Sequence, residues 1–366
     1  MPFFAKRLDA AFWLPWLIYC VVFISPLVLL DRILALRPGL AGRQLWWMLG
    51  CAGLALLNHQ LYPATRLVQF PSSAPDALIE PALALAAGRH PYSVLLPDGA
   101  PISPGPGWVL LNAPLTLSGL IYLMAPFYLM LSAGLLAGMA AWRANLYVAL
   151  LLICVCFFQM SVVAHDLLAF SLAAVALTAL LYRSYHNPGW LLLCAVLAAF
   201  IATARVPFVL LPILLALCLF KIDRRRALIF AGIAALTGAA IHGFFYAWAE
   251  TLSLFYQPLH VFGRGARSGT TLYQIATMLL WLLLLIWLYR GWRGADIAAW
   301  FRFIWFGMFL PFAAVGVGEL FGMAEITLAA FGNWEGKGYV FFTTPLLAAA
   351  LACGWPQNKT AGLARR

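Results

Sequence analysis

Residues 71–115 read PSSAPDALIEPALALAAGRHPYSVLLPDGAPISPGPGWVLLNAPL, and they form the one long polar-bearing stretch in an otherwise apolar chain. The alanine-rich run ALIEPALALAA follows Asp76 and predicts a short helix. Gly88 is placed to end this helix as its C-cap, and a proline- and glycine-rich return follows. A loop of this length that carries its own helix is more often functional than a passive connector. We therefore expect the working part of the protein here.

The composition places this loop in a membrane protein. Of the 366 residues, 64% are hydrophobic and only 10% are charged. A soluble domain typically has about half of its residues apolar and about a quarter charged. We therefore predict an all-α polytopic membrane protein in which residues 1–366 form a single integral membrane domain.

Apolar segments recur along the chain and predict about eleven transmembrane helices, within a range of roughly 10 to 12. Several are shorter than the roughly 20 residues that a full crossing needs, so we expect their ends to lie against protein or in a water-filled cavity. The segments are residues 12–30, 45–61, 119–141, 145–163, 167–182, 190–203, 206–220, 227–249, 271–290, 299–318 and 338–354.

Basic residues mark every second connection between these segments. Because cytoplasmic loops are enriched in Lys and Arg, we assign those connections to the cytoplasm. The loop 62–118 then lies outside, which in a bacterium is the periplasmic side of the inner membrane. The N-terminus has no small-residue cleavage site and is expected to be retained. The basic residues used are Arg32, Arg37, Arg43, Arg143, Arg183, Lys221, Arg224, Arg225, Arg226, Arg290, Arg293, Lys359, Arg365 and Arg366.

The remaining composition excludes several classes of site. The net charge of +11 does not indicate a nucleic-acid partner, because the basic residues fall in short clusters between apolar runs. The seven cysteines all lie inside apolar runs and are expected to be small core residues. Cys154 and Cys156, two positions apart on an expected helix, should point to different faces. The histidines are not spaced as metal ligands, so we expect no metal.

The loop also resembles a known family. An acidic residue, a short alanine-rich helix, GRHPY at residues 88–92 and SPGPGW at residues 103–108, closing on NAPL, resemble the first external loop of GT-C superfamily glycosyltransferases. The likeness is nearest to the bacterial, polyprenyl-phosphate-sugar-dependent branch that includes mannosyltransferases. Here Ser103-Pro104-Gly105-Pro106 replaces that branch's usual Tyr-Pro-Pro step. Outside residues 71–115 only the rhythm of apolar segments matches.

The resemblance implies a GT-C-like fold with a helical periplasmic first loop. It also implies a hexosyl- or pentosyltransferase that moves a sugar, with inversion, from a polyprenyl-phosphate donor to a glycan or glycolipid acceptor. In GT-C enzymes the acidic residue at this place takes a proton from the acceptor hydroxyl, so Asp76 is the expected catalytic base. An acidic residue at a helix start is also favoured by the helix dipole, so capping is the alternative role. The expected partners are the lipid donor, the acceptor and membrane lipids, without a cofactor.

Basic side chains on the outer side are candidate ligands of the donor phosphate, because guanidinium groups match phosphate oxygens in pairs. Arg264 and Arg267, with glycine neighbours, are the first choice, and contact with anionic lipid headgroups is their alternative role. Arg205 lies between two short apolar runs. Its alternative role is that of a side chain that snorkels to the membrane interface. The full set of expected phosphate ligands is Arg264, Arg267, Arg205, Lys337 and His165.

A further set of side chains is expected to contact the sugar or the acceptor. His165 and Asp166 face the outer side, and their alternative role is helix capping, with Asp166 as the N-cap of the following run. Near the end of the chain, the alternative role of Lys337 and Tyr339 is to form part of a belt at the membrane interface. The expected sugar and acceptor contacts are Glu80, Arg89, His90, Tyr92, Asp166 and Tyr339.

Two other functions remain open at this point. In a lipid-linked-glycan flippase or transporter the charges would line a path, although such proteins tend to show two repeated halves and no internal repeat is visible here. A polysaccharide polymerase that uses lipid-diphosphate glycans would also need external arginines.

Overall fold

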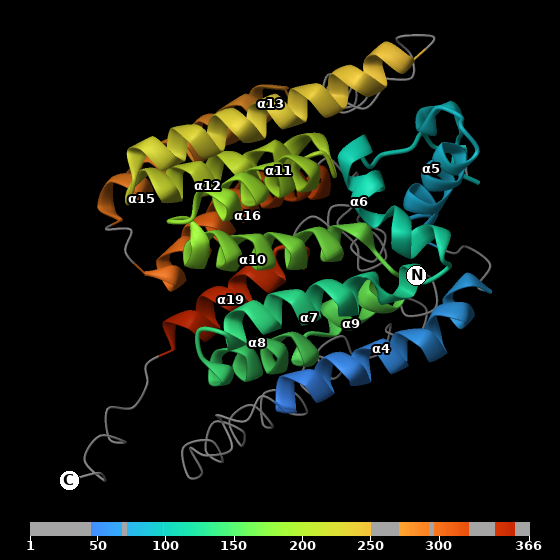
Figure 1. The fold of residues 1–366 in the computed structure, drawn as a ribbon, viewed down its shortest axis with the longest axis horizontal. Helices are drawn as coiled ribbons and strands as arrows, with labels where there is room; N and C mark the ends of the chain where they lie inside the picture. The colour runs from blue at the N-terminus through green and yellow to red at the C-terminus, as the bar shows by residue number, and fades with distance from the viewer. Residues whose placement is uncertain are drawn as a thin grey trace.

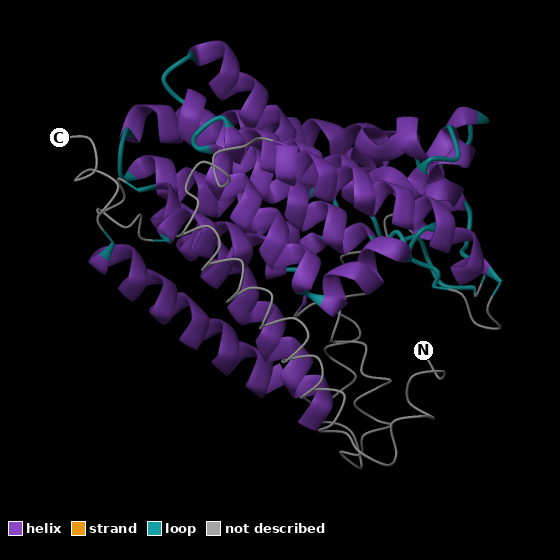
Figure 2. Cartoon of the chain, turned by 90° about the horizontal axis from the view of Figure 1, so that it is seen from below, coloured by secondary structure: helices purple, strands orange, loops and turns teal. Residues whose placement is uncertain are grey.

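The computed structural model describes residues 45–67, 72–97, 99–249, 271–292, 296–321 and 341–355, without the side chains of residues 206–207, 271–278 and 312–321. These residues form thirteen α-helices and three short 3₁₀-helices, and the described part of the chain contains no strand (Figure 2). The prediction of an all-α protein is confirmed for this part. The expected segment 12–30 lies outside it.

The helices follow the predicted apolar segments closely from residue 166 onward. The 3₁₀-helices η1 (Pro91–Ser93), η2 (Ile121–Leu123) and η3 (Val206–Val209) lie at turns and breaks. The α-helices are α4 (Leu45–Arg66), α5 (Asp76–Ala86), α6 (Pro106–Leu117), α7 (Met124–Ala137), α8 (Ala141–Ile153), α9 (Val155–Val162), α10 (Asp166–Ser184), α11 (Pro188–Ala202), α12 (Leu210–Phe220), α13 (Arg224–Trp248), α15 (Thr271–Gly291), α16 (Ile297–Phe321) and α19 (Thr344–Gly354).

Helix α10 lies at the centre of the bundle. It packs against α7, α11 and α19, and nearly all of its side chains are buried. A helix that is apolar all round is stable only when neighbours cover every face, and the leucine- and alanine-rich sequence of α10 meets that condition. Phe170 stacks on Phe208 with 3.7 Å between ring centroids and lies 6.1 Å from Phe342. The first residue of α10, Asp166, is therefore carried by a rigid element.

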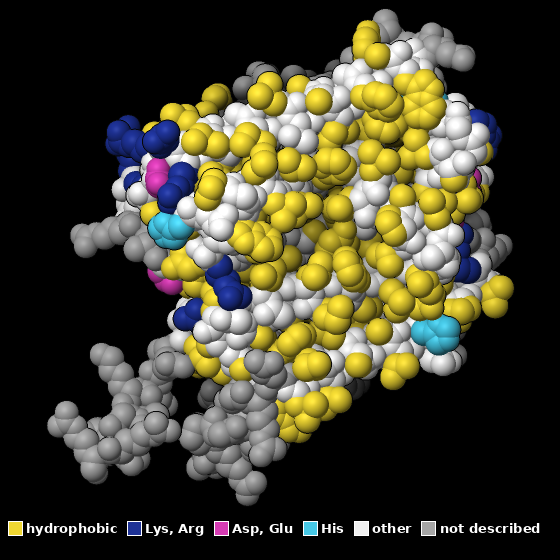
Figure 3. All heavy atoms as spheres, viewed as in Figure 1, with side chains coloured by type: hydrophobic (Ala, Val, Ile, Leu, Met, Phe, Trp, Pro, Cys, Tyr) yellow, Lys and Arg dark blue, Asp and Glu magenta, His cyan; other side chains and the backbone are white. Residues whose placement is uncertain are grey.

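Basic side chains gather at one end of the bundle, which we call the basic end. Arg226 Nη1 lies 2.9 Å from His186 Nδ1, and Lys221 Nζ lies 4.3 Å from the centroid of the Tyr289 ring. Connections that are far apart in the sequence therefore meet here, as the alternation of basic loops predicts. Figure 3 shows Lys and Arg side chains gathered at the left-hand end, with hydrophobic side chains over the middle of this face.

The opposite end, which we call the loop end, carries residues 72–105 and the turns at residues 163–166 and 203–205. In Figure 1, α5 and α6 lie on the right-hand side of the molecule, where α4 also ends. Helix α6 begins at Pro106 and was not expected, because its sequence falls inside the predicted outer loop. It packs against both α5 and α11, and so it connects the loop to the bundle.

Two described helices, Asp166–Ser184 and Arg224–Trp248, are long and apolar enough to cross a membrane alone. The number rises to 4 if each of two bent pairs counts as one span: Pro106–Leu117 with Ile121–Ala137, bent by 116°, and Ala141–Ile153 with Val155–Val162, bent by 82°. The described residues thus support membrane-crossing helices, but they do not confirm about eleven spans.

The continuous helix predicted over residues 145–163 is wrong. The chain breaks at Cys154, whose backbone is extended with φ −80° and ψ 108°. Cys154 is the N-cap of α9 and Cys156 lies in its first turn, so the two cysteines do not lie within one continuous helix over residues 145–163. The sequence near residue 154 contains no glycine or proline that would have predicted this break.

Candidate active site

Helix α5 begins and ends where the sequence predicts. Its last turn is closed by the Arg89 N–H, which donates to the Ala84 carbonyl oxygen at 2.8 Å, and by the Gly88 N–H, which donates to the Leu85 carbonyl oxygen at 3.0 Å. Gly88 has φ +69°, the left-handed conformation that a Schellman turn requires. The predicted C-cap is therefore confirmed, and the turn leaves the Arg89 side chain exposed.

Asp76, the first residue of α5, is buried and forms an ion pair. Nη2 of Arg66 lies 2.7 Å and 2.9 Å from the two carboxylate oxygens, and Nη1 of Arg66 donates to the Ser72 carbonyl oxygen at 2.9 Å. The N-cap position is held by Pro75 in a helical conformation, without a capping side chain. Asp76 lies in the first turn of α5, where the helix dipole favours it as the alternative role expects, and its carboxylate also pairs with an arginine on another helix.

Arg66 is the site residue that the sequence analysis missed. It is the last residue of α4, which continues past the predicted end at residue 61 and includes Pro63. One signal could have identified it. Arg66 lies in the predicted outer loop, where it breaks the alternation of basic connections, as Arg205 also does.

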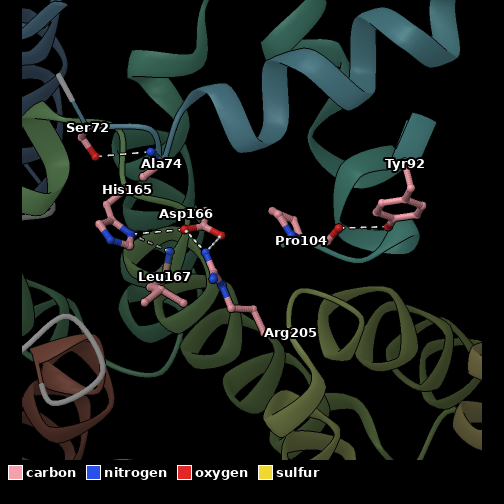
Figure 4. A network of polar contacts seen from close by, with 8 residues as sticks. All are labelled: Ser72, Ala74, Tyr92, Pro104, His165, Asp166, Leu167 and Arg205. Carbon is pink, nitrogen blue, oxygen red and sulfur yellow. Dashed lines mark hydrogen bonds and ion pairs between the residues drawn. The ribbon is translucent and has the colours of Figure 1, made fainter. Parts of the chain in front are cut away.

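A second ion pair lies at the N-terminus of α10. Nη2 of Arg205 lies 3.0 Å and 3.2 Å from the Asp166 carboxylate oxygens, and the Asp166 side chain is only 1% exposed. Asp166 lies between His165 and Arg205 (Figure 4). A carboxylate this deeply buried needs a charged partner, which Arg205 supplies. Arg205 is therefore not a snorkelling side chain.

His165, and not Asp166, caps α10. Its Nδ1 lies 3.2 Å from the Leu167 backbone nitrogen and 3.2 Å from Asp166 Oδ1. A neutral His165 can accept the Leu167 N–H at Nδ1, whereas a protonated ring can donate from Nδ1 to the carboxylate. The prediction that Asp166 is the N-cap is wrong, because its side chain is turned to Arg205.

The turn before His165 stores backbone strain. Ala164 has φ +52° and is fully buried, and the His165 N–H donates to the Met160 carbonyl oxygen at 2.9 Å. This is a second Schellman turn, with alanine at the position that glycine usually occupies. A left-handed conformation costs a non-glycine residue about 1–2 kcal/mol. The strain lies directly beside the buried ion pair, where surrounding packing must hold it.

Hydrogen bonds between the SPGPGW segment and Thr203 connect the loop to the bundle beside Arg205. The Gly105 N–H donates to the Thr203 carbonyl oxygen at 2.8 Å, and the Trp108 N–H donates to Thr203 Oγ1 at 2.8 Å. A Cβ atom on Gly105 would overlap the Thr203 carbonyl oxygen. The SPGPGW segment therefore serves a close backbone approach that only glycine permits at residue 105. It brings the loop within two residues of Arg205.

The GRHPY segment is tied to its surroundings by its own side chains. His90 Nδ1 accepts the Tyr92 N–H at 3.3 Å, and Nε2 donates to the Phe245 carbonyl oxygen at 3.1 Å. The Tyr92 hydroxyl donates to the Pro104 carbonyl oxygen at 2.9 Å (Figure 4). Burial raises the pKa of Tyr92 well above its usual range, so this hydroxyl keeps its proton. Both residues therefore hold the loop in place.

The other predicted site residues divide into two groups. Glu80 is half-buried on α5, and no hydrogen bond or ion pair joins it to another described side chain. The second group lies outside the described residues: Arg264, Arg267, Lys337 and Tyr339. The described part of the chain holds no group of three or more His, Cys, Asp or Glu side chains arranged to bind a metal ion.

The site therefore consists of two carboxylate–arginine pairs at the loop end, one peripheral and one buried, joined through α6 and Thr203. Ser72 and Ala74, just before α5, appear in the same close view as the Asp166 pair (Figure 4). Such a site offers carboxylate oxygens that can accept a proton and guanidinium groups that can bind an anion. Comparisons with protein-family models, with curated proteins and with solved structures found no match.

Proposed function

We propose that this protein is a membrane glycosyltransferase of the GT-C type. It transfers one sugar from a polyprenyl-phosphate donor to a glycan or glycolipid acceptor, with inversion at the anomeric carbon. The observation that carries the proposal is the Asp76–Arg66 pair, which lies at one end of an apolar helical bundle, next to the folded GRHPY and SPGPGW segments. These are the two segments on which the family resemblance rests.

In this mechanism Asp76 acts as general base. A carboxylate oxygen takes the proton of the acceptor hydroxyl while the hydroxyl oxygen forms a bond to the anomeric carbon. The bond between that carbon and the phosphate oxygen breaks, and polyprenyl phosphate leaves. Arg66 contacts both carboxylate oxygens and so orients Asp76. Its donation to Ser72 fixes the guanidinium in turn.

The leaving phosphate needs cationic neighbours. Arg205 and His165 border the loop anchor, and they would contact the phosphate by exchanging part of their interaction with Asp166 for it. Arg264, Arg267 and Lys337 remain proposed phosphate ligands on the sequence argument alone. The sugar and acceptor contacts proposed for Glu80, Arg89 and Tyr339 rest on the same argument.

We also propose an orientation, in the bacterial cytoplasmic membrane with the loop end outside. The basic end supports this placement, because lysine and arginine accumulate on the cytoplasmic side. Short and broken helices at the loop end support it too, since their open backbone groups need protein or water around them. The donor's lipid tail would lie along the apolar surface while its phosphate reaches the loop end.

A transfer assay tests the proposal. The purified full-length chain is incubated with a panel of radiolabelled polyprenyl-phosphate sugars and a membrane lipid extract, with and without chelator. We expect label in the acceptor fraction for the native chain and for Glu80→Gln, but not for Asp76→Asn. Glu80 lies on the same helix and is a proposed acceptor contact, so Glu80→Gln should weaken acceptor binding at most and still transfer the label. Transfer only from lipid-diphosphate glycans would identify a polymerase instead, and lipid movement without transfer would identify a flippase.

A further inference from the structure

Aromatic and polar side chains lead along α4 to the Asp76 ion pair. His59, Tyr62 and Arg66 follow one another at spacings of three and four residues, so they share one face of the helix. Tyr122 of η2 packs on this face, with its ring centroid 5.4 Å from that of His59 and 5.9 Å from that of Tyr62. Its hydroxyl lies 3.2 Å from His59 Nδ1. We call His59, Tyr62 and Tyr122 the aromatic row.

Hydrogen bonds from buried Asn58 hold the backbone of Tyr122 in place. Its Nδ2 donates to the Tyr122 carbonyl oxygen at 2.9 Å, to the Ser161 carbonyl oxygen at 3.1 Å and to Ser161 Oγ at 2.9 Å. Asn58 is fully buried, and the carbonyl groups that it satisfies lie at the bend before α7 and in the last turn of α9. Buried backbone carbonyls need such partners. The position of Tyr122 is therefore preorganised by the core.

Tyr62 connects the row to the proposed base. Burial raises the pKa of Tyr62, while the charge of Arg66 lowers it and the charge of Asp76 raises it. Both members of the ion pair therefore act on this phenol, which keeps its proton near neutral pH. The row ends where Arg66 meets the Asp76 carboxylate at 2.7 Å.

The row is open to a ligand. Tyr62 and Tyr122 are partly exposed and His59 is exposed. Aromatic side chains also form belts at membrane–water interfaces. Here the Tyr122 ring contacts both His59 and Tyr62, and Tyr62 lies one helical turn from Arg66 of the ion pair. Aromatic faces with a few polar groups beside them are typical of small-molecule sites. A pyranose ring has both surfaces that such a site needs, apolar C–H faces and a rim of hydroxyls.

We propose that the aromatic row is the acceptor subsite, where a glycan stacks on Tyr62 and Tyr122 and hydrogen-bonds to His59 and Arg66. This inference rests on the proposed function, because the row ends at Asp76. The accepting sugar lies beside Tyr62, so that its hydroxyl reaches the Asp76 carboxylate. The inner sugars of the acceptor lie toward His59. The length of the row favours an acceptor of two or more sugar residues over a single sugar.

Binding is tested without turnover, in the full-length Asp76→Asn chain purified in detergent. Saturation-transfer NMR is recorded with a panel of neutral trisaccharides built from glucose, mannose or galactose. Loss of one stacking ring should weaken binding about fivefold. Tyr62→Ala and Tyr122→Ala should therefore lose most of the signal from the sugar C–H protons, and Tyr62→Phe should keep it. Tyr246→Ala, which removes an exposed aromatic near the end of α13, should change nothing.

Unchanged binding in both alanine variants would overturn the inference. The same follows from an equal loss in Tyr246→Ala, or from no signal with any trisaccharide. Elution profiles and unfolding temperatures establish that each variant is folded, and Tyr62→Phe provides a folded reference that retains the ring.

The transfer assay separates this inference from the proposed function. In the chain with native Asp76, Tyr62→Ala should raise the KM for acceptor about fivefold, with the KM for donor unchanged. Transfer with an unchanged acceptor KM would leave the proposed function standing and remove the subsite. Trisaccharide binding that depends on Tyr62, in a chain without transferase activity, would keep the subsite and remove the proposed function.

Discussion

The two carboxylate–arginine pairs at the loop end use the same chemistry in different surroundings. The side chains of Asp76 and Arg66 are 11% and 30% exposed, whereas those of Asp166 and Arg205 are 1% and 19% exposed. Asp76 lies on a short helix at the edge of the bundle, but Asp166 begins the most buried helix of the molecule. A partly exposed pair contributes less to stability than a fully buried one, and the protein is strongly destabilised when one partner of a fully buried pair is removed. The Asp76–Arg66 pair is therefore suited to take part in the reaction, and the Asp166–Arg205 pair is suited to stabilise the fold.

The largest expected effect is on turnover at the peripheral pair. Asp76→Asn keeps the size of the side chain but removes the proton acceptor, and loss of a general base costs about a hundredfold to ten-thousandfold in rate. Arg66 is partly exposed, so loss of this pair should cost less stability than loss of a fully buried pair. The variant should therefore fold, bind donor and turn over very slowly, which transfer assays and thermal unfolding measure together. Glu80→Gln, which removes a proposed acceptor contact on the same helix, should raise the KM for acceptor at most and keep a near-native rate at saturating acceptor. Near-native turnover of Asp76→Asn would reassign the base, with Asp166 the next candidate.

The buried pair should respond in the opposite way. Asp166→Asn leaves the Arg205 guanidinium without its carboxylate, and breaking a buried pair costs about 3–5 kcal/mol. We expect a large drop in unfolding temperature, with the turnover per folded molecule much less affected than in Asp76→Asn. Replacing both partners, in Asp166→Leu with Arg205→Met, should recover part of the stability, because apolar side chains can replace a buried pair. A stable but inactive Asp166→Asn would instead assign this residue to the reaction.

An intermediate effect is expected at Arg66, which tests whether Asp76 reacts or only pairs. Arg66→Gln removes the group that orients the carboxylate but keeps the base, so we expect about a tenfold loss of turnover, corresponding to about 1.4 kcal/mol. The exchanged chain, Arg66→Asp with Asp76→Arg, restores an ion pair but moves the carboxylate to α4. It should be inactive and somewhat less stable than the native chain, because each charge then lies at the unfavourable end of its helix. Activity in the exchanged chain would show that pairing alone is needed.

Most of the fold could be predicted from the sequence, because long apolar runs have one stable outcome. The segment 167–182 became α10 with nearly the same bounds, and Gly88 ended α5 as its sequence indicates. The break at Cys154 could not be predicted. Beyond the break, α9 is held against α4 by Asn58, which donates to Ser161 in the last turn of α9. Such partners are distant in sequence and leave no local signal.

The candidate site could be predicted only in part. Asp76, His165, Asp166 and Arg205 stood out as polar residues in apolar surroundings, and the structure brings the last three together. Their pairing was not visible, because it depends on how α10 and η3 are placed in space. Arg66 was missed because its helix runs on through Pro63, a residue that usually ends or kinks a helix.

The smallest expected effects on stability are at the two Schellman turns. One, at Gly88, is at the edge of the molecule, and the other, at Ala164, is in the core. Gly88 has φ +69° with no atom within 4 Å of a Cβ added there, so Gly88→Ala adds only the cost of the left-handed conformation, about 1 kcal/mol. Ala164→Gly removes that cost. It also removes a buried methyl group, at about 0.8 kcal/mol, and increases the entropy of the unfolded chain.

These contributions nearly cancel at residue 164, so Ala164→Gly should change the free energy of unfolding by less than about 0.5 kcal/mol, against about 1 kcal/mol for Gly88→Ala. Thermal unfolding of both variants in the same detergent measures the difference. A marked stabilisation by Ala164→Gly would mean that packing around Ala164 does not compensate the strain beside Asp166. The buried pair would then be held under uncompensated strain, and the comparison with the peripheral pair would have to include backbone conformation as well as exposure.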